Sequence, residues 1–335
     1  MPSIEREAHR IVIAGASSLL GAELKSLLEE SKFADWDFRL LDEEDAAGTL
    51  TEAGGEPAVI QTVEEGSFEK AKFVFFTGSP GFTSTNLPAA KRSPGKIVDL
   101  SGSLVCEGGV TVWFPGLDEL RGSAFSPSAA AYAIPSAAGA AAAALALALS
   151  RWRANRMAFQ WFQPVSEAGR AGIEELESQT GQLLSFQSVG QPVFDAQVAF
   201  NMLDRYGAAS AYKLDAVCER VRAELKAALG NSALAPSLQV LHAPVFYGTM
   251  FSAYAELDPR AEAVKIAKAC ADAGLLLTAR DEPGPSNVSA AGEKMIQLAQ
   301  PKPDPAHPGT WWFWGAADNI RLPAANAVKL AEKLA

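Results

Sequence analysis

Short apolar runs alternate with amphipathic segments through the first hundred residues. Residues 17–30 carry Leu20, Leu24, Leu27 and Leu28 at helical spacing, so a helix is expected there. A shorter helix is expected at 87–92. Buried strands are expected at 11–15, 38–41, 58–63, 72–76 and 96–100. This alternation of strand and helix predicts a doubly wound parallel sheet.

The pattern changes in the second half of the chain, where alternating strands are longer. Strands are expected at 157–164, 238–257 with a break near Pro244, 275–278 and 311–314. Helices are expected at 173–184, 214–229, 261–273 and 323–334, the first with Glu174, Glu175 and Glu177 facing outward. Long antiparallel strands with helices predict an α+β domain. At 335 residues the chain is long enough for two domains. We place the first at 8–135 and 320–335, and the second at 136–319.

An alanine-rich segment at 131–150 joins the two patterns. Its small side chains predict a helix that lies close to a sheet and is fully buried, too short in its apolar part to span a membrane. Just before this helix, Ser136 is the one residue of 136–139 with a nucleophilic atom. A serine beside a turn is typical of a helix N-cap, and no base for a nucleophilic role is evident in the sequence.

Charge and composition limit the possible partners. The formal net charge of −10 and the pI near 5.0 argue against nucleic acid, which requires a dense basic face. Small molecules or proteins are the expected partners. The first ten residues lack the apolar core of a signal peptide, which favours a cytoplasmic location. Three separated cysteines indicate free thiols, and the three histidines are too scattered for a local metal site.

A glycine-bracketed loop, GASSLLG at 15–21, follows the first strand. Such a loop presents amides to a pyrophosphate at a helix N-terminus, although Ser18 replaces the middle glycine of the dinucleotide fingerprint. A cofactor cradle and a purely structural turn are both open. Acidic residues at 42–45 favour NAD, since a carboxylate bonds ribose hydroxyls and repels a 2′-phosphate. A solvated acidic loop is the alternative.

The order of segments resembles the aspartate-semialdehyde dehydrogenase family, which shares its architecture with N-acetylglutamyl-phosphate reductase. IVIAGASSLLG is similar to the family's GATGxVG loop, VFFTGSPGFTS to FFSAGGSxS, and KIVDLSGS to VVIDxSS. FQPVSEAGRAGIEEL is similar to YQxVSGAGxxGxxEL, and the C-terminal segment to DNLRKGAAxNAVQIAE. The resemblance covers nearly the whole chain. It implies a Rossmann-type sheet with an α+β dimerisation domain, and a homodimer.

The family's catalytic positions are substituted here. The resemblance puts the nucleophilic cysteine at Ala137, its preceding asparagine at Ser136, and the basic histidine at Thr249. His242 takes the place of the arginine that binds the substrate carboxylate, while Gln163 is retained. We therefore expect no intact catalytic set, only a vestigial pocket of these five residues. The chain resembles the family's non-catalytic, usg-type paralogues.

The resemblance also implies a cofactor site, where fewer of the family's residues are substituted than at the catalytic positions. Asp45 stands where the family has an arginine that favours NADP, so NAD is expected over NADP, if a dinucleotide binds at all. Two alternatives stay open: an NAD-dependent oxidoreductase that forms no thioester, and a dimeric scaffold or binding partner. The expected cofactor-binding residues are Gly15, Ser17, Ser18, Leu19, Leu20, Asp42, Thr77, Gly78 and Asn319.

Overall fold

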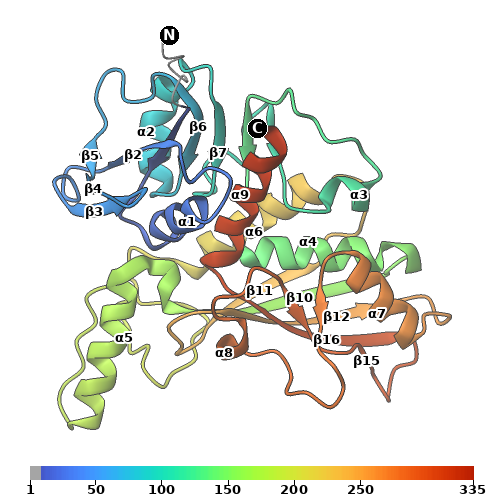
Figure 1. Cartoon of the computed structure of the whole chain (residues 1–335). Helices are drawn as coiled ribbons and strands as arrows, with labels where there is room; N and C mark the ends of the chain where they lie inside the picture. Colours follow the sequence, from blue (N-terminus) through green and yellow to red (C-terminus); the bar gives the residue numbers. More distant parts are fainter. Residues whose placement is uncertain (1–8) are drawn as a thin grey trace. The chain divides into compact units, whose positions relative to one another are not determined.

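A computed structural model describes residues 9–335 and divides the chain into two compact units (Figure 1). The first unit holds the chain up to Phe114, then Phe125–Ile134 and Pro323–Ala335. The second holds Pro115–Ala124 and Pro135–Leu322, so a short excursion at 115–124 joins it as well. Residues 1–8 lie outside the described part of the chain. They include the predicted start of the first domain, at residue 8, and most of the ten residues used to argue against a signal peptide.

A seven-stranded parallel sheet forms the centre of the first unit, as predicted. Its strand order is β5-β2-β1-β6-β7-β9-β8, and each pair is parallel. The order reverses direction between β1 and β6, which is the point where doubly wound sheets bind ligands. The strands are β1 Arg10–Ala14, β2 Asp37–Asp42, β5 Gln61–Thr62, β6 Ala71–Phe76, β7 Lys96–Asp99, β8 Val110–Val112 and β9 Ala131–Ala133.

Side-chain alternation along β1 builds a core on each face of this sheet. Ile11 and Ile13 pack on one face with apolar residues of α1 (Leu19–Glu29) and α9 (Arg321–Leu334). Val12 and Ala14 pack on the other face with residues of α2 (Pro80–Ala90). Because successive residues of a strand point to opposite faces, a continuous apolar run is required for a sheet covered on both sides.

Two predictions for the first unit need correction. The helix expected at 87–92 is only the end of α2, which begins at Pro80 because the Ser79 hydroxyl accepts the Phe82 amide at 3.0 Å. The strand expected at 58–63 is divided. Its first part belongs to a separate hairpin of β3 (Leu50–Ala53) and β4 (Glu56–Val59), and only β5 joins the main sheet.

A mixed sheet forms the second unit and confirms the α+β prediction. Its order is β11-β10-β12-β16-β14-β13, with β15 paired to β16. The strands are β10 Arg156–Gln163, β11 Ser237–His242, β12 Thr249–Glu256, β13 Leu276–Leu277, β14 Gln297–Leu298, β15 Lys302–Pro303 and β16 Thr310–Ala317. The strand expected at 238–257 is interrupted near Pro244, as predicted, but its two parts are separate strands that do not continue one another. Residues 243–248 carry the chain from β11, parallel to β10, to β12 on its other side, antiparallel to it.

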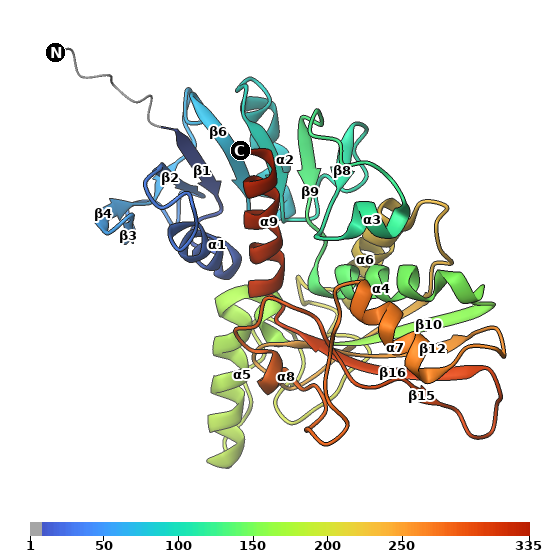
Figure 2. The same cartoon turned by 45° about the vertical axis from the view of Figure 1, so that its right-hand side comes forward.

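Three helices lie over one face of the mixed sheet (Figure 2): α4 Ala137–Leu149, α6 Leu214–Leu229 and α7 Ala263–Asp272. All thirteen residues of α4 are buried, as the alanine-rich pattern predicted. No helix in the described part of the chain has the length and apolarity needed to cross a membrane. The remaining helical segments are α3 Leu117–Arg121, η1 Ser150–Trp152, η2 Val165–Ala168, α5 Gly169–Leu184 and α8 Asn287–Ala290.

Helix α5 differs from its predicted orientation at one residue. Glu174 and Glu177 are exposed, but Glu175 is buried. Its carboxylate accepts hydrogen bonds from the backbone amides of Val193 and Phe194. Burial raises the pKa of this carboxyl, against the lowering effect of those amides. The outward prediction failed here because a distant loop, invisible to helical periodicity, supplies the hydrogen bonds.

The opposite face of the mixed sheet carries an aromatic surface, which we call the open face. Trp312 and Trp314 point to it and are 45% and 37% exposed, whereas Trp311 is buried on the helix-covered face. On the open face Trp314 contacts Phe162, and Trp312 packs edge-to-face on Tyr254. Helix α8 lies against one end of this face, where Nε1 of Trp314 donates to the Pro285 carbonyl at 2.8 Å (Figures 1 and 2). The alternation within 310–317 thus divides its tryptophans between a core and a surface.

Candidate functional site

The loop after β1 packs backbone against backbone with the loop after β6. Gly15 has φ +97°, and a Cβ added there would lie 2.1 Å from the Gly78 nitrogen. Gly21 lies in the first turn of α1, and a Cβ added there would lie 2.3 Å from the Gly15 carbonyl oxygen and 2.9 Å from the Thr77 hydroxyl. Gly15 and Gly21 are therefore required by close approach, and they bring together the loops after β1 and β6.

Most backbone amides of this loop already have partners inside the protein. The amides of Gly15 and Ala16 both donate to the Leu41 carbonyl, at 2.8 and 3.1 Å. The Ser18 amide donates to the Gly15 carbonyl, and its hydroxyl caps α1 by accepting the Gly21 amide at 2.9 Å. The first helical amides, those of Leu19 and Leu20, are the ones that a helix leaves without intrahelical acceptors.

Asp42 closes the loop from the end of β2. Its Oδ2 accepts the Ser17 amide at 2.7 Å and its Oδ1 accepts the Glu43 amide at 2.9 Å. The residue is only 8% exposed, so its carboxylate braces the turn from within. Glu43, Glu44 and Asp45 are exposed beside it. The structure thus gathers Gly15, Ser17, Ser18, Leu19, Leu20, Asp42, Thr77 and Gly78 at one edge of the first unit.

Asn319 belongs to the second unit and has internal partners there. Its Oδ1 accepts the Gly248 amide at 2.9 Å, and its Nδ2 donates to the Ser166 hydroxyl at 3.0 Å. Beside it, Glu167 keeps solvent-accessible surface. Loss of hydration among the neighbouring protein groups nevertheless raises the pKa of the Glu167 carboxyl, while Arg220 and Asn319 lower it.

Ser136 caps α4 and also contacts a buried acid that sequence reasoning missed. Its Oγ accepts the Gly139 amide at 3.1 Å and donates to Oε2 of Glu224 at 2.6 Å. Glu224, on α6, is 0% exposed, and its Oε1 accepts Nε of Arg220 at 2.9 Å. Gly139 makes room for this carboxylate, because an added Cβ would lie 2.0 Å from Oε2. The signal in the sequence was a glutamate among inward-facing apolar residues of α6.

The other positions of the vestigial pocket are buried in the same unit. Ala137 begins α4, and Thr249 begins β12. Gln163 lies opposite His242 in the parallel pair of β10 and β11, and its Oε1 accepts Nε1 of Trp161 at 3.0 Å. No group of three or more metal-binding side chains occurs among residues 9–335.

His242 is enclosed by partners rather than directed at a ligand. Its Nε2 lies 3.2 Å from the Val198 carbonyl, which only accepts, so Nε2 carries the proton. Its Nδ1 then accepts from the Tyr206 hydroxyl at 3.2 Å. Burial lowers the pKa of His242, partly offset by the bond to Val198. A neutral imidazole at this position provides no positive charge to hold a substrate carboxylate.

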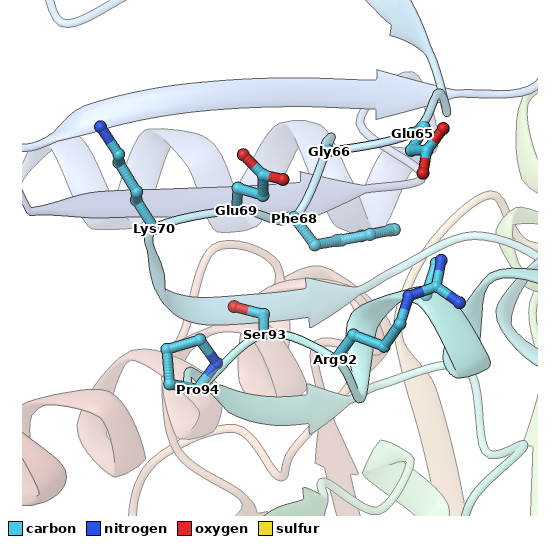
Figure 3. A pocket seen from close by; sticks show the side chains of 9 residues that line it. Glu65, Gly66, Phe68, Glu69, Lys70, Arg92, Ser93 and Pro94 are labelled. Carbon is cyan, nitrogen blue, oxygen red and sulfur yellow. The ribbon is translucent and has the colours of Figure 1, made fainter.

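A surface pocket in the first unit lies elsewhere. It has a volume of about 410 Å³ and opens beside the start of β6 (Figure 3). Glu65, Glu69, Lys70 and Arg92 place charges of both signs around it, over the ring of Phe68. None of the predicted site residues lines this pocket. Its mixed charge favours no ligand class.

The class of protein follows from the two units together with comparison to known proteins. Residues 145–322 match the family model described as semialdehyde dehydrogenase, dimerisation domain. The chain belongs to the semialdehyde dehydrogenase family, which confirms the resemblance recognised in the sequence.

Individual relatives and solved structures are similar to this chain over nearly its whole length. The chain is 30% identical to a USG-1 protein homolog of Azotobacter vinelandii over 333 residues, covering 97% of each chain. It is 23% identical to an aspartate-semialdehyde dehydrogenase of Rickettsia bellii, again over 97% of each. The solved structure of a probable aspartate-semialdehyde dehydrogenase from Pseudomonas aeruginosa superposes with a TM-score of 0.85 at 25% identity, covering 98% of each chain. A Candida albicans aspartate semialdehyde dehydrogenase with NADP shares the fold, at a TM-score of 0.68 and 15% identity, covering 97% of this chain and 98% of that one.

We predict that His242 makes stability fall on mild acidification. Its folded pKa lies below the unfolded value of about 6.5, so the folded state binds fewer protons. Its contribution is complete above that value and is lost as pH falls below it, with a slope of up to about 1.4 kcal/mol per pH unit. Urea unfolding between pH 7 and pH 5 measures this slope. His242→Gln should reduce it, and His307→Gln at an exposed site should not. Equal slopes in all three proteins would contradict the prediction.

Proposed function

We propose that this protein has no phosphate-dependent semialdehyde dehydrogenase activity. The observation that carries the proposal is Ala137, a buried methyl side chain at the start of α4, where the resemblance places the nucleophilic thiol. Alanine forms no thioester. Thr249, buried in a strand, offers no base in place of the histidine. The neutral His242 further supports the loss, since it cannot pair with the substrate carboxylate.

The direct test is an assay with aspartate semialdehyde, phosphate and either NADP or NAD. We expect no phosphate-dependent formation of reduced cofactor above a blank without protein, with an active aspartate-semialdehyde dehydrogenase assayed in parallel. Ala137→Cys alone should restore no turnover, because Thr249 supplies no base. Turnover by the wild-type protein would overturn the proposal.

We further propose that the first unit retains a dinucleotide site that prefers NAD. The first-turn amides of Leu19 and Leu20 would hold the pyrophosphate at the N-terminus of α1, where the helix dipole favours negative charge. The tight approach of Gly15 and Gly78 places two backbone segments side by side near this helix terminus. Bound NAD would supply a hydride acceptor. The exposed acids beside Asp42 disfavour the 2′-phosphate of NADP.

Calorimetric titration with each dinucleotide tests this site. We expect micromolar binding of NAD and weaker binding of NADP. Asp45→Arg should strengthen NADP binding a few-fold with little change for NAD, whereas Asp281→Arg, an exposed acid of the second unit, should change neither. Absence of NAD binding up to millimolar concentration would refute the cofactor site and leave the dimeric scaffold. NAD binding without activity on the semialdehyde would instead justify a screen for a different oxo substrate.

We propose that the chain forms a homodimer through the open face of the mixed sheet. The family model matched by residues 145–322 supports this assignment, since it describes a dimerisation domain. Phe162, Met250, Tyr254, Trp312 and Trp314 provide a contiguous apolar and aromatic surface on that face. Nearly all large apolar side chains exposed in the described residues belong to the second unit, with Leu50 and Val59 as exceptions. Aromatic surfaces of this kind are typical of subunit interfaces.

A charge placed on the open face should dissociate the dimer. Trp314→Lys buries an unpaired ammonium in the proposed interface, and we expect a loss of about 2 kcal/mol or more in association free energy. Val264→Lys is the matched control, since Val264 is 74% exposed on α7, which covers the opposite face of the sheet. Sedimentation equilibrium measures both. A monomeric wild-type protein at micromolar concentration, or dissociation by Val264→Lys alone, would contradict this interface.

A further inference from the structure

Ser136 and Glu224 together form a pair that the lost thiol chemistry does not use. We propose that Ser136 is a nucleophile for acyl transfer from an activated ester or thioester, with Glu224 as its general base. This proposal depends on neither the dinucleotide site nor the dimer, because both residues lie within the second unit. In this proposal, Glu224 supplies the base for Ser136 that was not evident in the sequence.

The hydroxyl of Ser136 is oriented for proton transfer. Its Oγ donates to Oε2 of Glu224 at 2.6 Å, a short distance typical of a charge-assisted hydrogen bond. The Gly139 amide donates to the same Oγ from the other direction. The Ser136 side chain therefore has one defined rotamer, with its proton already on the path to the carboxylate. Ser136 is half-buried rather than enclosed, and the proposed attack requires that an acyl compound reach its Oγ.

Glu224 is placed as a base shielded from water. It is 0% exposed, and Nε of Arg220 holds its other oxygen at 2.9 Å, which leaves Oε2 for the serine proton. Arg220 is itself half-buried, but a charge enclosed as fully as that of Glu224 is costly, and apolar residues at such positions are commonly at least as stabilising. The same inward face of α6 is otherwise apolar at Val221, Leu225 and Ala228. Helix capping needs only the serine, so capping does not account for the buried acid.

The start of α4 suits the charge that develops during attack. The helix has thirteen residues and presents its positive dipole end beside Ser136. The side chains of Ala137 and Ala138 are single methyl groups. An oxyanion formed on the substrate carbonyl beside Oγ would be stabilised by this dipole end.

The reaction balances without a cofactor. Ser136 Oγ bonds to the carbonyl carbon while its proton passes to Glu224. The tetrahedral intermediate then collapses, the alcohol or thiol leaves with the proton from Glu224, and an acyl-serine remains. Water, deprotonated by Glu224, cleaves the acyl-serine to release a carboxylic acid and regenerate the hydroxyl.

Labelling with a serine-selective fluorophosphonate, followed by peptide mapping of the purified full chain, tests the nucleophile. We expect modification at Ser136, together with hydrolysis of p-nitrophenyl acetate. Glu224→Gln should slow both by about 100-fold or more, the usual effect of removing a general base. Ser136→Ala should abolish the adduct. Ser150→Ala, which changes a serine at the other end of α4, should have no effect on either.

The wild-type adduct map requires no substituted protein, so the test survives a variant that fails to fold. Circular dichroism and melting temperature identify such a variant. Absence of an adduct at Ser136 in the folded wild-type protein would reduce this residue to a helix cap and overturn the proposal. Labelling of folded Glu224→Gln at the wild-type rate would overturn the role of Glu224.

Discussion

The close packing of α4 in the second unit depends on the small size of its side chains. Thirteen buried residues, mostly alanines, let α6 and α7 approach this helix while all three cover the mixed sheet. A larger side chain within α4 would displace one of its neighbours, because protein interiors are close-packed. The constraint is strictest at Gly139, where even a methyl group would collide with Glu224. The buried Glu224 carboxylate can therefore occupy its position only because residue 139 of α4 has no side chain.

This packing also determines which side chains surround the start of α4. The first residue of α4 carries a methyl group, His242 is neutral and enclosed, and Thr249 is a buried strand residue. What remains polar is organised around Ser136, with Glu224 and Arg220 behind it. We propose that this region lacks the groups of a covalent dehydrogenase, although its side chains remain hydrogen-bonded. A fully buried carboxylate is costly even when half-buried Ser136 and Arg220 satisfy it, which is why we infer chemistry there.

The first unit follows a different constraint, the meeting of two backbones at the ends of β1 and β6. Gly15, Gly21 and Gly78 permit that approach, and Asp42 and Ser18 use their side chains to hold the turn. The turn would keep its shape without a ligand, since most of its amides have internal acceptors. The first amides of α1 remain for an anion, and we propose that the exposed acids nearby favour NAD over NADP.

The sequence by itself determined the class of fold, because apolar runs of period two or 3.6 and closely spaced glycines act locally. It also predicted the buried alanine helix and, through its motifs, the family. Only the tertiary structure decided which strands β11 and β12 flank, that Glu175 faces inward, and that Glu224 meets Ser136 across 88 positions of the chain. Each of these depends on partners distant in sequence, whose hydrogen bonds and packing leave no periodic signal in the residues that receive them.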